Sequence, residues 1–468
     1  MCGLNFTMLP GIVDDMNKAI SHRGIRSSSK EVDGAYLGHV RLPIVGLDKK
    51  FDQPYEYKGW TILFVGEIYN YEGLNNQAES DIEVLAEYWV KYGERAFSFF
   101  EGMWSAIFVK DRRAWVFIDP LGKKPLYYCG RGAELTISSE IKPLANLMSG
   151  YWDLKNLKEI FNPLYFSSIK KWGYPLSIET PYRGVYKLDP GVCLLIDLKT
   201  GEIGNPRGYP GGTIEVNKNK RLIRPAIEQA VFDRLDASDV PISLLLSGGL
   251  DSSIIYKIAS NLTHNITCFH SNNGEEEFLN YLDIPSDIPV VKLENRVSAL
   301  SEILYYNESP VDLGSMINQY QLAEGIKEKG FQVVLSGDGA DELFGGYKRI
   351  LEYDSQYSDI FQELVYYHLP RLDKLNMANT IELRCPFLSH RVIGMALGLS
   401  WEERKEKKFL KEIFSDIIPK EILNRKKKAL KHPLVLEQGS LKWVRYLCDV
   451  FYELEKARCE RADQNFTQ

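Results

Sequence analysis

Residues 241–260 read PISLLLSGGLDSSIIYKIAS, which is an apolar run, a glycine-rich turn and a second apolar run. The run 241–246 has the length and composition of a buried strand. Gly248 and Gly249 let the backbone turn so that its N–H groups point at an anion, and a following helix adds its positive end. This order predicts a phosphate site at the end of a strand in an α/β domain. The alternative is a plain strand–helix turn capped by Asp251, which the complete string SGGLDSS disfavours.

Polar side chains in this turn suit a bound triphosphate. Ser247 and Ser252 can donate hydrogen bonds, and Asp251 can hold Mg²⁺ on the phosphates. The chain contains no GxxxxGK[ST] string, so the turn is not a Walker A loop. SGGLDSS instead resembles the pyrophosphate loop of the ATP pyrophosphatase superfamily. That resemblance implies adenylation of a substrate with release of pyrophosphate, and it implies ATP and Mg²⁺ as cofactors. It places these residues in the ATP site: Leu245, Ser247, Gly248, Gly249, Asp251 and Ser252.

A second strand-and-turn unit, FQVVLSGDGADELFGGY, occupies 331–347. Its carboxylates Asp338, Asp341 and Glu342 stand close together and repel one another unless a cation neutralises them. A calcium loop is one alternative, but the glutamate that ends an EF-hand loop is missing. A solvated acidic turn is the other.

The two loops, together with LPRLDKLNMANTIELRCPFL (369–388), KKFLKEIF and LNRKKKAL, resemble the synthetase domain of the asparagine synthetase family. The resemblance implies that Ser336 and Gly337 contact ATP. It also implies that Asp338 takes part in forming an aminoacyl adenylate and that Asp251 and Asp341 hold Mg²⁺. The family's R-x-K pattern falls on Arg425 and Lys427, and Lys427 is expected to stabilise charge on the leaving pyrophosphate. Without the resemblance, RKKK is typical of a solvated helix end.

The segment 199–220 is dense in Gly, Pro and Asn and is predicted to link two domains. Upstream, β-rich runs alternate with turns, which predicts a largely antiparallel β domain with a few helices over 1–198. Downstream, apolar strands alternate with helical segments, which predicts an α/β domain with a parallel sheet over 221–468, helical from about residue 354 onward.

Cys2 directly follows the initiator methionine. If Met1 is removed, the α-amine of Cys2, whose ordinary pKa is near 8, lies beside the thiol and can act as its general base. Any chain can begin Met-Cys by chance, so the surrounding sequence decides whether this cysteine is a nucleophile.

Motifs in the first 145 residues raise that expectation. In order they are SHRG (21–24), RLPIV (41–45), GEIYN (66–70), ESDIEV (79–84), EGMW (101–104) and DPLGKKPLYY (119–128). They resemble class II glutamine amidotransferases, which are N-terminal nucleophile hydrolases with an αββα sandwich. The resemblance implies that Cys2 attacks the glutamine amide and that Gly66 donates an oxyanion-hole N–H. It further implies a glutamine site in which Arg41 holds the carboxylate and Glu67 and Asp81 hold the ammonium group, with Leu42, Ile44, Val45 and Gly66 lining it.

One departure from that family bears on rate. The residue before Gly66 is normally an Asn whose amide is a second oxyanion donor, and here it is Val65. Losing one such donor typically costs about 10²–10³ in rate. This change leaves three alternatives open: a weak glutaminase, a different residue as the second oxyanion donor, or the use of free ammonia. Smaller departures fall at Arg26, Ile118, Ser389 and Lys411.

A further departure concerns the acceptor of the amide nitrogen. The stretch between His270 and Val290 is shorter than in the family, and only 35 residues follow Pro433. His270 falls where the family contacts adenine through its backbone, and a core or edge histidine is the simpler interpretation. The synthetase domain is therefore a compact one, whose acceptor pocket need not match aspartate.

Composition excludes several other classes. Lys and Arg number 57 against 63 Asp and Glu, a net charge of −6, which argues against a nucleic-acid coat. No apolar run is long enough for a membrane span, and the N-terminus is no secretory signal. The seven cysteines are scattered without a CxxC pair, which predicts a reducing, cytoplasmic location and neither a disulfide framework nor a zinc site.

We therefore expect a glutamine-dependent ligase. Cys2 would release ammonia from glutamine while the second domain adenylates a carboxylate with ATP, and ammonia would displace AMP. Aspartate is the expected acceptor by resemblance, and a carboxylate on a sugar, natural product or peptide is the alternative. A homodimer is compatible with the resemblance. Two other interpretations stay open: an ATP-dependent ligase with a weak or lost glutaminase, and a scaffold without catalysis.

Overall fold

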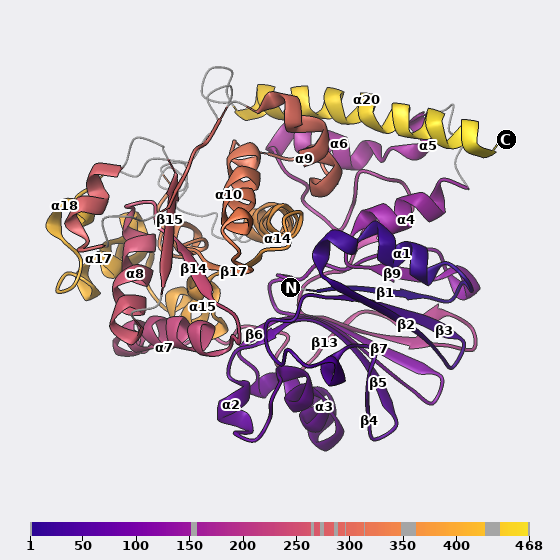
Figure 1. The fold of residues 1–468 in the computed structure, drawn as a ribbon, viewed down its shortest axis with the longest axis horizontal. Helices are drawn as coiled ribbons and strands as arrows, with labels where there is room; N and C mark the ends of the chain where they lie inside the picture. Colours follow the sequence, from indigo (N-terminus) through magenta and orange to yellow (C-terminus); the bar gives the residue numbers. More distant parts are fainter. Residues whose placement is uncertain are drawn as a thin grey trace.

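The computed structural model describes residues 2–150, 157–263, 266–271, 276–284, 289–294, 296–312, 314–347, 362–425 and 440–466. Within these ranges the chain forms a first domain of antiparallel sheets and a second domain built on a parallel sheet (Figure 1). The predicted order of a β-rich half followed by an α/β half is therefore confirmed.

Within the described residues, the first domain stacks two antiparallel sheets. One sheet has the order β10 (Val185–Lys187), β8 (Tyr127–Cys129), β9 (Thr136–Ser138), β1 (Gly3–Thr7), β3 (Ala35–Arg41) and β2 (Arg26–Val32). The other has the order β12 (Glu202–Ile203), β11 (Val192–Asp197), β7 (Arg113–Ile118), β6 (Gly102–Lys110), β5 (Trp60–Ile68) and β4 (Tyr55–Tyr57), with β13 (Arg207–Gly208) paired to β11.

Alternating apolar residues hold these sheets face to face. Leu4 and Phe6 of β1, Leu63 of β5 and Ile107 of β6 are fully buried in one cluster between the layers. Helices cover the two outer faces, as the figure shows for α1 and α3 (Figure 1). The helices of this half are α1 (Val13–Ala19), α2 (Tyr71–Leu74), α3 (Asp81–Tyr92), α4 (Ile141–Met148), α5 (Leu157–Ile160) and α6 (Pro163–Trp172). The predicted αββα sandwich is confirmed.

The second domain is built on a parallel sheet with the order β16 (Val290–Val291), β15 (Thr267–Ser271), β14 (Ile242–Leu245), β17 (Val333–Leu335) and β18 (Glu382–Arg384). Its helices in the described residues are α7 (Ile223–Asp236), α8 (Leu250–Leu262), α9 (Leu300–Asn307), α10 (Met316–Glu328), α11 (Ala340–Leu343), α14 (Leu369–Met377), α15 (His390–Leu397), α16 (Trp401–Arg404), α17 (Lys408–Ile413), α18 (Lys420–Leu423) and α20 (Ser440–Phe466). Both predicted phosphate loops follow neighbouring strands, β14 and β17, so they meet at the carboxyl edge of the sheet.

The segment predicted as a linker, 199–220, is only partly a connection. Strands β12 and β13 fall within it and pair with β11. Tyr209 is buried and its hydroxyl donates to the carbonyl of Ile118 at 2.6 Å, so the chain stays attached to the first domain up to that point. The boundaries themselves stay a prediction.

The C-terminal helix α20 returns to the first half of the chain. It lies along α6 at the top of the molecule (Figure 1). Trp443 and Phe451 of α20 are buried in one cluster with Phe166 of α6. The two halves are thereby joined at their far side as well as through the linker.

The described cysteine thiols are free. None of the helices in the described part of the chain has the length and hydropathy needed to span a bilayer.

Candidate functional site

Cys2 directly precedes β1 and is 9% exposed, at the edge of the apolar cluster between the sheets. Its Sγ lies 3.9 Å from the carbonyl oxygen of Leu42, to which the thiol donates. Burial raises the pKa of this thiol above its ordinary value, so the thiol form is favoured. A nucleophile here needs a base that takes the thiol proton, which is the role predicted for the α-amine of the same residue.

Gly66 sits in β5 with φ +143°, a conformation that L side chains rarely adopt. A Cβ built at this position would lie 1.9 Å from the carbonyl oxygen of Met103 on β6. The close approach of β5 and β6 therefore requires glycine at this position, next to the predicted substrate-binding Glu67.

Glu67 and Asp81 are both buried acids with few compensating contacts. Glu67 Oε2 lies 3.7 Å from Arg384 Nη2, while Asp81 accepts the N–H of Ile68 at 3.0 Å. Burial, assisted by Glu382 and Asp81, raises the pKa of Glu67 well above its ordinary value. Burial likewise raises the pKa of Asp81 to about 6. Buried acids with raised pKa values favour an incoming cation, which is what the ammonium group of glutamine would supply.

Arg41, predicted to hold the glutamine carboxylate, is 5% exposed at the end of β3. Its Nη1 donates to Asp48 O at 2.9 Å and to Asp52 Oδ1 at 2.7 Å, and its Nη2 donates to Val45 O at 3.2 Å and to Gly46 O. The guanidinium thus shapes the loop that also carries the predicted lining residues. Those residues, Leu42, Ile44 and Val45, are all buried.

Val65 lies in β5, opposite Ser105, and is 1% exposed. Its side chain belongs to the same apolar cluster as Cys2. This position therefore supplies packing and no hydrogen-bond donor from its side chain.

The first phosphate loop has the geometry that its sequence predicts. Gly248 has φ +69°, and Gly249 caps the N-terminus of α8. Ser252 Oγ accepts the N–H of Ser247 at 3.2 Å and lies 3.1 Å from Ser247 Oγ. The Gly249 N–H donates to Ser247 Oγ at 3.3 Å, so the serine hydroxyls brace this glycine-rich turn at a helix N-terminus. Leu245, at the end of β14, leads into it.

The second loop packs directly on the first. A Cβ at Gly337 would lie 2.9 Å from Cβ of Asp251 and 3.1 Å from the nitrogen of Ser252, so glycine permits this contact. In the second loop, the Ser336 hydroxyl donates to Asp338 Oδ2. The predicted ATP residues of both loops are thereby brought together at one edge of the sheet.

A lysine that was not among the predicted site residues bridges the two predicted metal-binding carboxylates. Lys407 Nζ lies 2.7 and 2.6 Å from the carboxylate oxygens of Asp251 and 2.5 Å from Asp341 Oδ1. Lys407 is 6% exposed, and Glu406 and Lys407 have φ of 54° and 59°. Two successive left-handed residues carry strain of roughly 1–2 kcal/mol each, which the surrounding structure must hold.

The third carboxylate of this loop has separate partners. Glu342 accepts the Tyr347 hydroxyl at 2.9 Å and lies 3.5 Å from His368 Nε2. Burial raises the pKa of Glu342 above its ordinary value. The repulsion expected among the three acids is thus relieved by spreading them over different partners.

The other predicted residues divide into described and undescribed ones. Arg425 places its Nη1 3.8 Å from the position of a Cβ at Gly249, beside the first loop. Lys427 lies outside the described residues, so its predicted role stays a prediction. His270 is buried at the end of β15, where its Nδ1 lies 3.2 Å from Ser271 O, which fits the simpler interpretation of a structural histidine.

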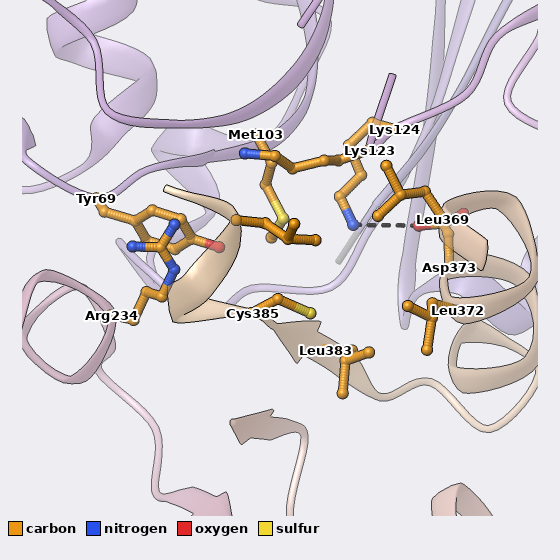
Figure 2. A pocket seen from close by; sticks show the side chains of 11 residues that line it. Tyr69, Met103, Lys123, Lys124, Arg234, Leu369, Leu372, Asp373, Leu383 and Cys385 are labelled. Carbon is orange, nitrogen blue, oxygen red and sulfur yellow. Dashed lines mark hydrogen bonds and ion pairs between the residues drawn. The ribbon is translucent and has the colours of Figure 1, made fainter. Parts of the chain in front are cut away.

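A cavity of about 30 Å³ lies between the domains. Figure 2 shows that its lining comes from both domains and includes Met103, Lys124, Asp373, Leu383 and Cys385, and Leu388 lines it as well. A single water needs about 10–15 Å³ by this measure, so the cavity admits molecules of the size of water or ammonia and excludes glutamine.

The cavity adjoins both sites. Met103 pairs with Glu67 across β5 and β6, and Leu383 and Cys385 flank Arg384, which faces Glu67. On the other side, a Cβ at Gly339, next to Asp338, would lie 2.3 Å from Leu388.

Comparison with known proteins agrees with this two-site geometry. The glutamine amidotransferase domain family matches residues 1–206, and the asparagine synthase family matches residues 222–356 and 352–451. Asparagine synthetase [glutamine-hydrolyzing] 1 of Lotus japonicus is 28% identical, over 91% of this chain and 77% of the relative. Its counterpart from Bacillus subtilis (strain 168) is 26% identical, over 93% and 86%.

The chain belongs to the glutamine-hydrolysing asparagine synthetase family. It is therefore a carbon–nitrogen ligase that takes its nitrogen from glutamine and uses ATP. A solved structure of glutamine phosphoribosylpyrophosphate amidotransferase from B. subtilis, complexed with ADP and GMP, is 13% identical, with a TM-score of 0.32 over 72% of this chain and 81% of that one.

Proposed function

We propose that this ligase converts aspartate to asparagine through an acyl-AMP intermediate, with ammonia that Cys2 releases from glutamine. The observation that carries the proposal is the pair of complementary sites on either side of one interdomain cavity, whose lining residues Met103 and Leu388 contact residues of, or next to, each site. Buried acids beside Gly66 suit a zwitterionic amino acid, while glycine-rich loops at helix N-termini suit a triphosphate.

In the first domain, the Cys2 thiol transfers its proton to the α-amine and attacks the side-chain amide of glutamine. Glu67 and Asp81 orient the substrate through its ammonium group, and the N–H of Gly66 donates to the oxyanion. The proton then passes to the departing nitrogen, which leaves as ammonia. Water hydrolyses the thioester to glutamate and restores the thiol.

In the second domain, the loops after β14 and β17 hold ATP so that an acceptor carboxylate oxygen attacks the α-phosphorus and pyrophosphate leaves. Mg²⁺ would supply charge neutralisation on the phosphates, and Asp251 and Asp341 would hold it. These carboxylates fit a cation, since they already share the ammonium of Lys407. The described residues contain no group of three or more His, Cys, Asp or Glu that could hold a metal ion.

Ammonia then crosses the cavity, attacks the acyl carbon and displaces AMP. Its path stays within the cavity that Met103 and Leu388 bound, between Glu67 and the Asp338 loop.

Acceptor-dependent exchange of pyrophosphate into ATP tests the second half. Aspartate is expected to support exchange, whereas a sugar acid or a peptide carboxylate is not. Exchange with another carboxylate but not with aspartate would replace the proposed acceptor, and the short 271–290 stretch motivates that comparison.

A second candidate is an ATP-dependent ligase that uses free ammonia, and the buried apolar Val65 favours it. Wild type and Cys2→Ala, each assayed with glutamine and with ammonium chloride, separate the two. Loss of glutamine-dependent product with retained ammonia-dependent product supports the glutaminase, whereas equal glutamine-dependent product from both proteins would remove it.

A further inference from the structure

Arg23 connects the main chain of Cys2 to the other domain. Its Nε donates to the carbonyl oxygen of Cys2 at 3.0 Å, its Nη1 to Glu140 Oε1 at 2.9 Å and its Nη2 to Asp373 Oδ2 at 2.9 Å. The side chains of Arg23, Glu140 and Asp373 are each at most 1% exposed. Asp373 belongs to α14 of the synthetase domain, 350 residues further along the chain.

The contact with Cys2 matters because of the chemistry proposed for that residue. Once Met1 is removed, Cys2 carries both the nucleophile and the base and is held by a single peptide bond. Pairing of β1 with β3 begins only at Gly3, and a Cβ on Gly3 would lie 3.0 Å from Cδ of Arg23. Gly3 therefore leaves room for Arg23 to reach the carbonyl of Cys2 and fix the orientation of this terminal residue.

Of the two acids that hold Arg23, Asp373 has fewer other basic partners among the described residues. Glu140 also lies 2.9 Å from His22 Nε2 and 2.5 Å from Lys142 Nζ, so several groups share its charge. Burial opposes ionisation of Asp373, but Arg23 and Lys124 hold its pKa below the ordinary value, so it stays charged. Figure 2 shows the contact of Lys124 with Asp373, at 3.1 Å, on the wall of the interdomain cavity.

We propose that Asp373 is a positioning residue for the glutaminase nucleophile, although it belongs to the synthetase domain. It holds Arg23, and Arg23 holds the carbonyl of Cys2, so the thiol and the α-amine point correctly only while α14 is docked. This inference rests on the proposed role of Cys2. The glutaminase site is then complete only when both domains are in contact.

The test compares two isosteric variants of the full-length protein, Asp373→Asn and Glu308→Gln. Glu308 is a matched control because it is another buried acid of this interface, 3.0 Å from Lys142 Nζ and 2.8 Å from Lys374 Nζ, with no contact to Arg23 in the described part of the chain. Asp373→Asn is expected to lower kcat of the glutaminase about 10- to 100-fold with little change in KM, since misplacement of a reacting group by about 1 Å has effects of that size. Pyrophosphate exchange should change little in either variant, and Glu308→Gln should keep its glutaminase.

Melting temperatures and a conservative variant complete the test. Both substitutions should lower the melting temperature, and Asp373→Glu, which keeps the charge, should fall between wild type and Asp373→Asn in glutaminase kcat. If Asp373→Asn fails to fold, Asp373→Glu compared with Glu308→Asp repeats the comparison. A wild-type kcat in the Asp373 variant, or equal losses in both positions, would overturn the inference. Glutamine-dependent product from Cys2→Ala would instead overturn the proposed function, whatever Asp373 does.

Discussion

The two sites of this ligase balance their charges in opposite ways. In the proposed glutaminase site, Glu67 and Asp81 are buried with raised pKa values, and Arg384 Nη2 lies 3.7 Å from Glu67 Oε2. In the synthetase site, Asp251 and Asp341 already share the ammonium of Lys407. Under the proposed function, the amino-acid site would receive a cation from its substrate, whereas the ATP site already has one in Lys407.

The largest expected effect comes from removing the lysine cation. Lys407→Met leaves two buried carboxylates facing each other without this counter-ion, which costs about 3–5 kcal/mol. Denaturant unfolding of the full chain should show this loss, and added Mg²⁺ or Mn²⁺ should recover part of it. The matched control is Lys408→Met, an exposed neighbour, expected to change stability by less than about 0.5 kcal/mol. Equal stability of the two variants would mean that the bridge contributes nothing.

The next largest effects are expected from two glycine substitutions, one in each site, which should each affect only one of the two activities. Gly66→Ala places a Cβ 1.9 Å from a backbone oxygen at φ +143°, so β5 and β6 must move apart. We expect a loss of glutaminase of about 10²-fold or more, the effect of losing an oxyanion donor, with pyrophosphate exchange retained.

Gly337→Ala makes a milder contact, 2.9 Å from Cβ of Asp251, with no unusual φ. We expect only about tenfold weaker ATP binding by isothermal titration, the equivalent of about 1.4 kcal/mol. If Gly337→Ala weakens ATP binding by a larger factor than Gly66→Ala lowers the glutaminase rate, the ATP site is the less tolerant of a backbone shift, which contradicts this prediction.

The two phosphate loops could be predicted from sequence because each is a local strand–turn–helix unit, complete within about twenty residues. Their meeting could not be predicted in the same way, because it depends on β14 and β17 being neighbours in the parallel sheet, which the structure shows. The sequence indicates that Asp338, Asp341 and Glu342 need a neutralising cation, and the resemblance predicts Mg²⁺ on Asp341, but neither identifies Lys407 as that cation. Lys407 comes from a turn between α16 and α17, and its two left-handed residues have no sequence signal of their own. The sequence offered only one indication of this contact: two acids that need a cation and a lysine, Lys407, in the same predicted domain.

Interdomain contacts could not be predicted in this way. Arg23 was visible only as part of SHRG, and Asp373 only as part of the stretch 369–388. No periodicity relates two side chains so far apart in sequence that meet at 2.9 Å. The same holds for the cavity, whose walls come from both domains.

The pH dependence offers a test of the uncompensated charge. The pKa of Asp81 is about 6, raised by burial from an ordinary value of 3.8. If Asp81 holds the ammonium group of glutamine as proposed, binding needs its ionised form, and KM for glutamine should rise by up to about tenfold per pH unit below pH 6. Ammonia-dependent synthesis, measured in parallel, should lack this rise.

The raised pKa of Asp81 also affects the stability of the fold, which should increase as the pH falls, whereas glutamine binding should weaken. Because the folded protein binds the proton more tightly than the unfolded chain, this group stabilises the fold as the pH falls from about 6 toward 4, by roughly 3 kcal/mol at most. Asp81→Asn should remove that dependence together with glutamine binding. A glutamine KM that stays flat between pH 5 and 7 would show that Asp81 is ionised throughout, and the contrast with the synthetase site would disappear.

The smallest expected effect tests whether Val65 limits the glutaminase. Val65→Asn restores an amide next to Gly66, and if that amide reaches the oxyanion it should raise glutaminase kcat by up to about 10²-fold, the usual worth of such a donor. The side chain is 1% exposed within an apolar cluster, so an amide without a partner there costs about 1–3 kcal/mol. We expect this cost to hold the gain to a few-fold and to lower the melting temperature.

Val65→Ala is the control, because it loosens the same packing without adding a donor. A higher kcat in the Asn variant than in both wild type and the Ala variant would show that the missing donor limits the rate. If the Asn and Ala variants have the same kcat, another N–H already donates to the oxyanion. The glutaminase site would then replace the donor missing at Val65, just as Lys407 neutralises the paired acids of the synthetase site.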